Sequence, residues 1–180
     1  MPDFPLTTTD ALGRSVTLEA PPQRIVSLVP SQTELLSFLE LDDRVLGITR
    51  FCVRPESWQD EKTIVGGTKQ VNLERAAELA PDLILANREE NTPDDVEALA
   101  DIAPVYVTDV PAVPDALAMI RAVGALVDRA DSAHQLADAI EQRLDALDLT
   151  PPIRAAYLIW REPFMTVGHD TIIHDIMTRG

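Results

Sequence analysis

Five polar residues follow directly on a short apolar run in PDLILANREEN, residues 81–91. Leu83 to Ala86 is typical of a buried strand, and the next residues are Asn, Arg, Glu, Glu and Asn. In an open parallel α/β sheet, ligands bind beyond the carboxyl ends of the strands, where the connecting loops converge. Amides, carboxylates and a guanidinium at such a place can orient a ligand. A solvated loop that only caps the next helix is the alternative, and the pattern alone leaves both open.

Polar segments follow the other predicted strands in the same way. Because the carboxyl ends of parallel strands lie at one edge of a sheet, all these segments should share one rim. Taken singly, Cys52 and Phe51 are more typical of a protein core than of a ligand site. The segments expected at the rim are Pro30-Ser31-Gln32, residues 50–54 (RFCVR), residues 87–91, Asp109 and Arg161-Glu162.

Catalytic and phosphate-binding motifs are not met. Residues 66–69 (GGTK) resemble a phosphate loop, but the order G-x-x-x-x-G-K-[ST] is missing, as are G-x-G-x-x-G and G-x-S-x-G. His169 and His174 are five residues apart and would point about 140° from one another on a helix, whereas one ion needs an i, i+4 pair. His134 lies among charged residues and is expected to be solvated. We therefore predict neither an enzyme nor a metal site.

The composition favours a globular binder of small or basic partners. Of 180 residues, 46% are hydrophobic, and a net charge of −15 argues against nucleic acid, which needs basic patches. Cys52 is the only cysteine, so no internal disulfide can form. The first ten residues contain neither a basic start nor an apolar run. A cytoplasmic protein and a mature form with a new initiator Met are both compatible with that start.

Strands alternate with helices through the first two thirds of the chain. Residues 7–19 predict a small hairpin, residues 25–29 a strand, and Ser31-Gln-Thr-Glu34 a capping box that opens a helix. Further strands are expected at 45–49, 83–86 and 105–108, with Asn72 and Thr92 as N-caps of the helices between them. This alternation predicts a parallel sheet covered by helices on both faces.

The remaining third begins with helices. An apolar stripe predicts a helix over about 132–147, roughly 24 Å long at 1.5 Å per residue. A strand at 155–160, another at 164–167 and a helix from about Thr171 follow, but thirty residues are too few to bury a core of their own. We therefore expect an N-terminal hairpin (1–22), an α/β lobe (23–130), a connecting helix (131–150) and the beginning of a second lobe that is otherwise absent (151–180).

The order of these segments resembles one family, the class III or helical-backbone substrate-binding proteins of ABC importers, which carry cobalamin, haem and iron-siderophores. Within it the cobalamin-binding type is most similar, through SLVPSQTELL and the NLER…PDLILA unit. The segments that carry the resemblance are DALGRSVTL, RIVSLVPSQTELL, VLGITRFCVRP, GGTKQVNLERAAELAPDLILANREEN and YLIWREPFMTVGHDTIIHDIM.

The resemblance implies a bilobed, non-catalytic binder that holds a metal chelate in a cleft and delivers it to a permease with its ATPase. It implies a periplasmic or cell-surface location, and no required cofactor. Glu74 would dock on the permease. Arg54 stands where many relatives have His, and His169 where many have Gly. The implied ligand-binding residues are Ser31, Phe51, Cys52, Arg54, Glu90 and Asn91 in the first lobe, and Arg161 and Phe164 in the second.

A cobalt corrinoid is the expected ligand. Arg54 and Arg161 could instead bind the carboxylates of haem or of an iron-siderophore in a bidentate manner. A cytoplasmic corrinoid- or chelate-binding protein is a second class of function. A small α/β enzyme is a third, although no nucleophile, base and orienting group can be assembled from the sequence.

Overall fold

The computed structural model describes residues 3–147 and 154–179. Its centre is a five-stranded sheet in the order β5-β4-β3-β8-β9, in which every neighbouring pair is parallel. The predicted end of the connecting helix (148–150) and the first residues of the next segment (151–153) lie outside the described residues. The strands of the central sheet are β3 (Ile25–Ser27), β4 (Val45–Ile48), β5 (Thr63–Ile64), β8 (Leu83–Asn87) and β9 (Val105–Thr108).

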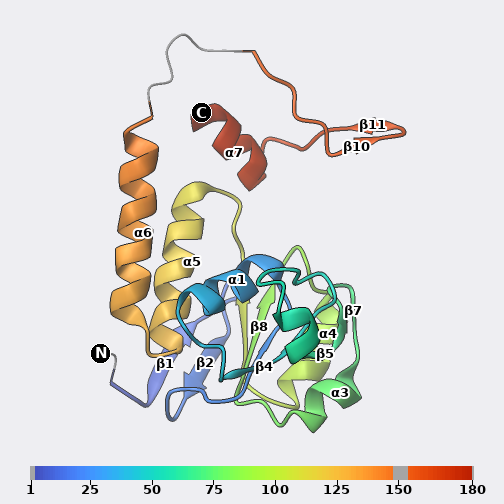
Figure 1. The fold of residues 1–180 in the computed structure, drawn as a ribbon, viewed down its shortest axis with the longest axis vertical. Helices are drawn as coiled ribbons and strands as arrows, with labels where there is room; N and C mark the ends of the chain where they lie inside the picture. Colours follow the sequence, from blue (N-terminus) through green and yellow to red (C-terminus); the bar gives the residue numbers. More distant parts are fainter. Residues whose placement is uncertain (1–2, 148–153, 180) are drawn as a thin grey trace.

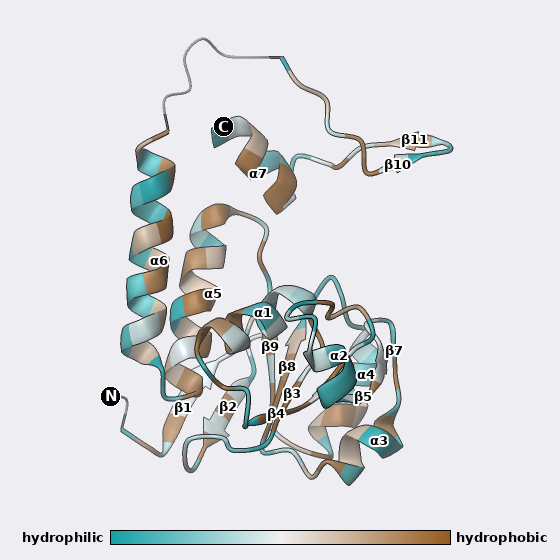
Figure 2. Ribbon diagram, viewed as in Figure 1, coloured by the Kyte–Doolittle hydropathy of each residue, from teal (hydrophilic) through white to brown (hydrophobic). Residues whose placement is uncertain are grey.

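Helices cover both faces of this sheet, as the alternation of elements predicted (Figure 1). Alternate residues of β8 enter different cores: Leu83 and Leu85 pack with α1, α5 and α6, and Ile84 packs with α3 and α4. Strands buried on both faces are nearly continuously apolar, and Figure 2 shows them as hydrophobic. The helices are α1 (Pro30–Phe38), α2 (Trp58–Glu61), α3 (Leu73–Glu78), α4 (Pro93–Ala100), α5 (Val113–Leu126), α6 (Ala130–Asp145) and α7 (Ile172–Arg179).

The N-terminal hairpin forms as predicted, from β1 (Leu6–Thr9) and β2 (Ser15–Leu18). Asp10 closes its turn: one carboxylate oxygen accepts from the N–H groups of Leu12 and Arg14, and the other from the Arg14 guanidinium at 2.6 Å. Burial opposes ionisation of Asp10, but the hydrogen bonds from Arg14 and Leu12 outweigh it and hold its pKa below the usual value. Arg14 also donates to Val105 O, which ties the turn to β9.

Two predicted helix caps are confirmed and one is wrong. The side chains of Asn72 and Thr92 accept from the backbone N–H three residues later, so they cap α3 and α4. The capping box at Ser31 does not form, because α1 begins one residue earlier, at Pro30. Proline is already set for the first helical position, so Val29 becomes the N-cap and Ser31 lies inside the first turn.

Helices α5 and α6 form an antiparallel pair beside the sheet (Figure 1). The helix expected at 132–147 is α6, which starts at Ala130 and ends at Asp145. Gly124 allows the two helices to approach closely, since a Cβ on Gly124 would lie 2.1 Å from the Ala133 Cβ. Arg121 and Asp138 add an ion pair of 2.7 Å across the pair.

The predicted strand at 155–160 is wrong. Only Trp160–Arg161 (β10) pairs, with Phe164–Met165 (β11), and residues 154–159 form no strand among the described residues. A strand needs a neighbouring strand for its backbone hydrogen bonds, and within 154–159 the described contacts give one such bond, from the Ile159 N–H to Met165 O on β11 at 2.9 Å. This segment and the β10–β11 hairpin expose large apolar side chains: Tyr157, Leu158, Ile159, Trp160, Phe164 and Met165.

A hydrogen bond between residues far apart in sequence attaches helix α7 to α5. Asp175 Oδ2 accepts from the Val113 N–H at 2.8 Å, at a helix start that has no cap from its own side chains. The hydrogen bonds from Val113 and from Arg179 lower the pKa of Asp175. None of the described helices is both long and apolar enough to cross a membrane.

Candidate ligand-binding site

The carboxyl ends of β3, β4, β8 and β9 lie at one edge of the sheet, as parallel strands require. Figure 1 shows this edge beneath α7 and the β10–β11 hairpin. The segments predicted to share the rim are linked there by hydrogen bonds, one loop to the next. The exception is the segment that contains Arg161, which lies on the hairpin.

The loop after β8 is fixed by its two asparagines. Asn87 Oδ1 accepts from the N–H groups of Glu89 and Glu90, and Asn91 Oδ1 accepts from the Asn87 N–H at 2.8 Å. Asn91 also donates through Nδ2 to Thr68 O, on the turn between β6 (Gly66–Gly67) and β7 (Gln70–Val71). The two amides are buried, and the charged residues between them are exposed. The polar run after β8 thus has two roles: its amides set the loop, and its charges face solvent.

Cys52 and Phe51 lie on opposite sides of the loop after β4. The Cys52 N–H donates to Thr49 O, which turns the Cys52 side chain inward, where Thr33 donates to its sulfur at 3.1 Å. Cys52 is fully buried, so the prediction that its side chain lines the ligand face is wrong for this structure. Phe51 is 53% exposed and points outward, so it lies at the surface, as its predicted ligand-binding role requires, and not in the core, as its residue type taken singly suggests.

A cation lies over the exposed ring. The Arg50 guanidinium carbon is 5.6 Å from the centroid of the Phe51 ring. Both side chains rest on Gly67, where an added Cβ would lie 3.0 Å from the Arg50 guanidinium and 3.2 Å from the ring. A larger residue at position 67 would displace this pair. Nothing local in GGTK predicts this packing, because residues 50 and 67 meet only through the parallel pairing of β4 with β5.

Other charged groups continue around the rim. Lys69 donates to Glu89 O, and Arg88 forms an ion pair of 3.1 Å with Asp109. These contacts connect the β6–β7 turn, the loop after β8 and the end of β9. The rim therefore has a fixed backbone that carries both signs of charge.

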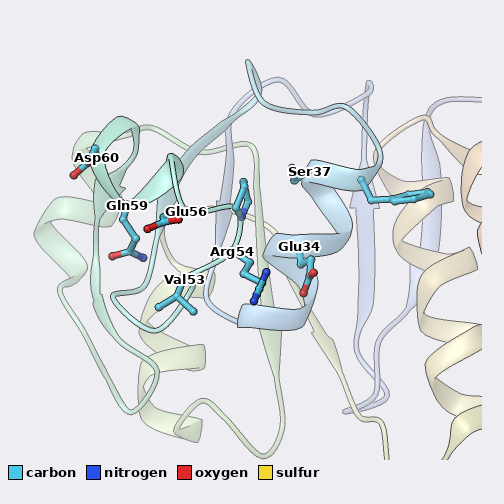
Figure 3. Close-up of a pocket in the computed structure, with 9 residues that line it drawn as sticks. Glu34, Ser37, Val53, Arg54, Glu56, Gln59 and Asp60 are labelled. Atoms are coloured by element: carbon cyan, nitrogen blue, oxygen red, sulfur yellow. The ribbon is translucent and has the colours of Figure 1, made fainter.

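A pocket with a volume of about 810 Å³ opens beside α1. Figure 3 shows Glu34 and Ser37 of α1 on one wall, Glu56, Gln59 and Asp60 on the other, and Arg54 between them. Of the residues predicted for the site, only Arg54 lines it. The acidic walls were missed because residues 34, 56 and 60 are far apart in sequence and fit no motif.

The ligand-binding residues predicted in the first lobe differ in how far their side chains are exposed. Ser31, Phe51, Arg54 and Glu90 are exposed at or beside the rim, whereas Asn91 is 3% exposed and acts through the backbone that it holds. Arg161 and Phe164 are exposed on β10–β11. Among the described residues, no hydrogen bond or ion pair joins that hairpin to the rim.

The remaining predicted residues lie elsewhere. Glu74 is exposed in the first turn of α3. His134 is exposed on α6, with Nδ1 2.7 Å from Ala130 O, and His174 is exposed on α7, whereas His169 precedes that helix. Within residues 3–147 and 154–179, no group of three or more His, Cys, Asp or Glu side chains is placed to hold a metal ion.

The family follows from a comparison of sequences. Residues 25–149 match the model of the periplasmic binding protein family, so the chain belongs to that family. Its members are substrate-binding proteins of transport systems and not enzymes. The expectation drawn from the resemblance is thereby confirmed at the level of the family.

The chain is also similar to individual binding proteins of known organisms. The chain is similar to a vitamin B12-binding protein of Pectobacterium atrosepticum, with 27% identity over 168 residues that cover 87% of this chain and 60% of the relative. A substrate-binding lipoprotein of an ABC transporter in Bacillus subtilis is 39% identical over 84 residues, or 47% of this chain and 26% of the relative. A cobalamin-binding protein of Halobacterium salinarum is 34% identical over 84 residues, 46% and 23% of the two chains.

Solved structures show the same fold. The periplasmic vitamin B12-binding protein BtuF of Vibrio cholerae superposes with a TM-score of 0.78 at 23% identity, covering 88% of this chain and 64% of that one. The siderophore-binding protein BauB gives a TM-score of 0.84 at 22% identity, with coverages of 97% and 66%. The fold is therefore that of helical-backbone binding proteins. This chain spans less than two thirds of the length of the curated relatives named above.

Proposed function

We propose that the chain is the substrate-binding component of an ABC importer and that a corrinoid binds on the rim of its first lobe. The observation that carries this proposal is the exposed Phe51 ring under the Arg50 guanidinium, on a loop fixed from beneath by buried hydrogen bonds. The relatives named for vitamin B12 support the same ligand.

The organisation proposed for this function is bilobed. In it, segments 1–22 and 23–130 would be the hairpin and the first lobe, segment 131–150 would connect the lobes through α6, which ends at Asp145, and segment 151–180 would begin the second lobe. The apolar side chains of residues 157–165 lie exposed above the rim, which supports a role in facing a ligand or the rest of that lobe (Figure 1). Arg161 and Phe164 would then form the opposite wall of the cleft.

The rim suits a broad disc with a polar edge. A corrinoid presents an apolar face, which an exposed aromatic ring can cover, and amide edges, which need a few oriented polar groups. Phe51 offers the ring, and Arg50 and Glu90 offer a donor and an acceptor on loops that the structure holds in place. Such a surface needs little rearrangement on binding, which lowers the entropic cost of association.

Haem or an iron-siderophore is the second candidate. Neither Arg54 nor Arg161 forms an ion pair with another described residue, so both guanidinium groups are available to carboxylates. BauB, which is similar in fold, is a siderophore-binding protein. Against this candidate, Glu34 and Glu56 line the same pocket as Arg54 and would repel an anionic ligand there.

Titration calorimetry of the natural gene product with cyanocobalamin, haem and a ferric siderophore distinguishes these ligands. The proposal predicts one-to-one binding that is tightest for cyanocobalamin. If haem binds more tightly, and Arg54→Gln weakens haem but not cyanocobalamin, the second candidate replaces the first. A corrinoid-binding protein of the cytoplasm would show the same affinity, so fractionation of the native cells tests the proposed periplasmic or cell-surface location.

We also propose that Glu74 docks on the permease that acts with its ATPase. Its carboxylate is exposed in the first turn of α3, on a different element from the rim loops. Glu74→Arg should therefore stop ligand uptake and leave ligand affinity unchanged. Glu78→Arg is the matched control, because Glu78 is an exposed acid on the same helix. Equal uptake by the two variants would contradict the docking role.

A further inference from the structure

A buried glutamine lies at the centre of the rim, and neither the comparisons nor the proposed function gives it a role. Gln32, in the first turn of α1, is only 1% exposed. Its Nε2 donates to Thr108 Oγ1 on β9 and to Ala86 O on β8, at 3.3 Å for the second contact. Because a carbonyl oxygen only accepts, the amide nitrogen must face β8, and this sets the orientation of the whole amide. One side chain thus joins three elements at the carboxyl edge of the sheet.

Thr108 links Gln32 to the loop after β8 by a further hydrogen bond, with Asn87. Its hydroxyl accepts from Gln32 and from Asn87 Nδ2 at 3.2 Å, and it donates to Ala86 O at 3.2 Å. One donated and two accepted hydrogen bonds are all that a hydroxyl can make. Asn87 then accepts from the backbone N–H groups of Glu89 and Glu90. A continuous series of hydrogen bonds therefore runs from α1 to the exposed part of the rim.

The other end of the Gln32 amide is unsatisfied by the protein. Gln32 Oε1 is buried and accepts no hydrogen bond from any residue that the structure describes. Burying an unpaired acceptor costs free energy, and this offsets part of what the two donated bonds contribute. An apolar side chain of the same length could therefore fill the space with little loss of global stability. What such a side chain could not do is orient Thr108.

We propose that Gln32 is a positioning residue that holds the Arg88–Glu90 loop in its ligand-facing conformation through Thr108 and Asn87. The effect on ligand rests on the proposed function, whereas the effect on the loop does not. A loop that is held in one conformation before the ligand arrives loses less entropy on binding, so the ligand dissociates more slowly. Asn87 contacts the backbone of the loop directly, and Gln32 and Thr108 act on the loop through Asn87.

Amide hydrogen exchange tests the effect on the loop. In Gln32→Met we expect the Glu89 and Glu90 amides to exchange about five-fold faster, the factor that corresponds to one net hydrogen bond. Gln142→Met is the matched control, since Gln142 is exposed on α6, and it should change nothing at the loop. A general increase of exchange over the whole sheet in Gln32→Met would instead show a purely structural role and overturn the proposal.

Thr108 allows the same test without a change to α1. Thr108→Val removes the hydroxyl and should give the same faster exchange at Glu89 and Glu90, whereas Thr108→Ser keeps the hydroxyl and should restore the wild-type rate. If these two amides exchange as fast in Thr108→Ser as in Thr108→Val, or if Gln32→Met leaves their exchange rates unchanged, the proposal is wrong.

Ligand binding provides the second measurement, with cyanocobalamin as the probe. Gln32→Met should weaken binding about five-fold, through faster dissociation at a nearly unchanged association rate. Equal affinity in a variant whose loop exchanges faster would contradict the claim that the loop position matters for ligand. If wild-type protein does not bind cyanocobalamin, the proposed corrinoid function fails, and the exchange rates still decide the role of Gln32.

Discussion

Gly124→Ala in α5 should have two opposite effects on stability, one from helix propensity and one from packing against α6. In an isolated helix this change is favourable by about 1 kcal/mol, because alanine loses less backbone entropy than glycine. In the protein the new Cβ would lie 2.1 Å from the Ala133 Cβ on α6, whereas carbon atoms normally approach to about 3.5–4.0 Å. The two helices would have to separate by more than 1 Å or distort.

Overpacking of this kind costs typically 1–3 kcal/mol, and both clashing atoms are attached directly to helical backbone, so the upper part of that range applies. We expect Gly124→Ala to lower the free energy of unfolding by a net of about 1–2 kcal/mol. Urea unfolding followed by circular dichroism measures this change. Ala133→Gly in the same chain removes the opposing Cβ, so the double variant should recover stability relative to the two single changes added together.

A Gly124→Ala variant as stable as wild type, or more stable, would refute the close approach of α5 and α6. So would additive effects in the double variant.

Three further predictions follow from the rim and from α7. Phe51→Ala should weaken corrinoid binding about ten-fold and leave stability almost unchanged, because the ring is already 53% exposed. Leu12→Ala, on the β1–β2 turn outside the rim segments and 46% exposed, should leave binding intact, and equal losses in a titration would contradict the site. The hydrogen bond from the Val113 N–H lowers the pKa of the Asp175 carboxyl, so this contact stabilises the attachment of α7 fully above the ordinary carboxyl pKa of about 4 and is lost as pH falls through the lowered value. Exchange of the Val113 amide should therefore show a pH-dependent loss of protection that is absent in Asp175→Asn, and identical profiles would disprove it. Cys52 is fully buried, so a thiol reagent should label it only when the protein unfolds, and rapid labelling of native protein would place the thiol at the surface instead.

Features that depend on neighbouring residues were predicted well from sequence. Asn72 and Thr92 cap helices within three residues of themselves, and the short apolar run at residues 83–86 forms the buried strand that it predicts. The parallel sheet followed from the alternation of such segments. The rim followed in turn, because the topology of a parallel sheet alone decides where its loops meet.

Features that depend on distant residues could not be predicted in this way. Gln32 and Thr108 are 76 residues apart, and no local pattern shows that their side chains meet. Cys52 was misplaced because β4 ends at Ile48 and the next turn rotates the side chain inward. The capping box at Ser31 fails for a local reason, since Pro30 occupies the first helical position and makes Val29 the N-cap.

Amide exchange of the natural gene product, with and without saturating cyanocobalamin, tests the central claim most directly. The account predicts that the ligand slows exchange at residues 50–54 and 88–91, on the loops that follow β4 and β8, and leaves α3 and the β1–β2 hairpin unchanged. Protection confined to another face of the lobe, or no protection at a concentration where binding is complete, would contradict the assignment of the rim as the ligand-binding face.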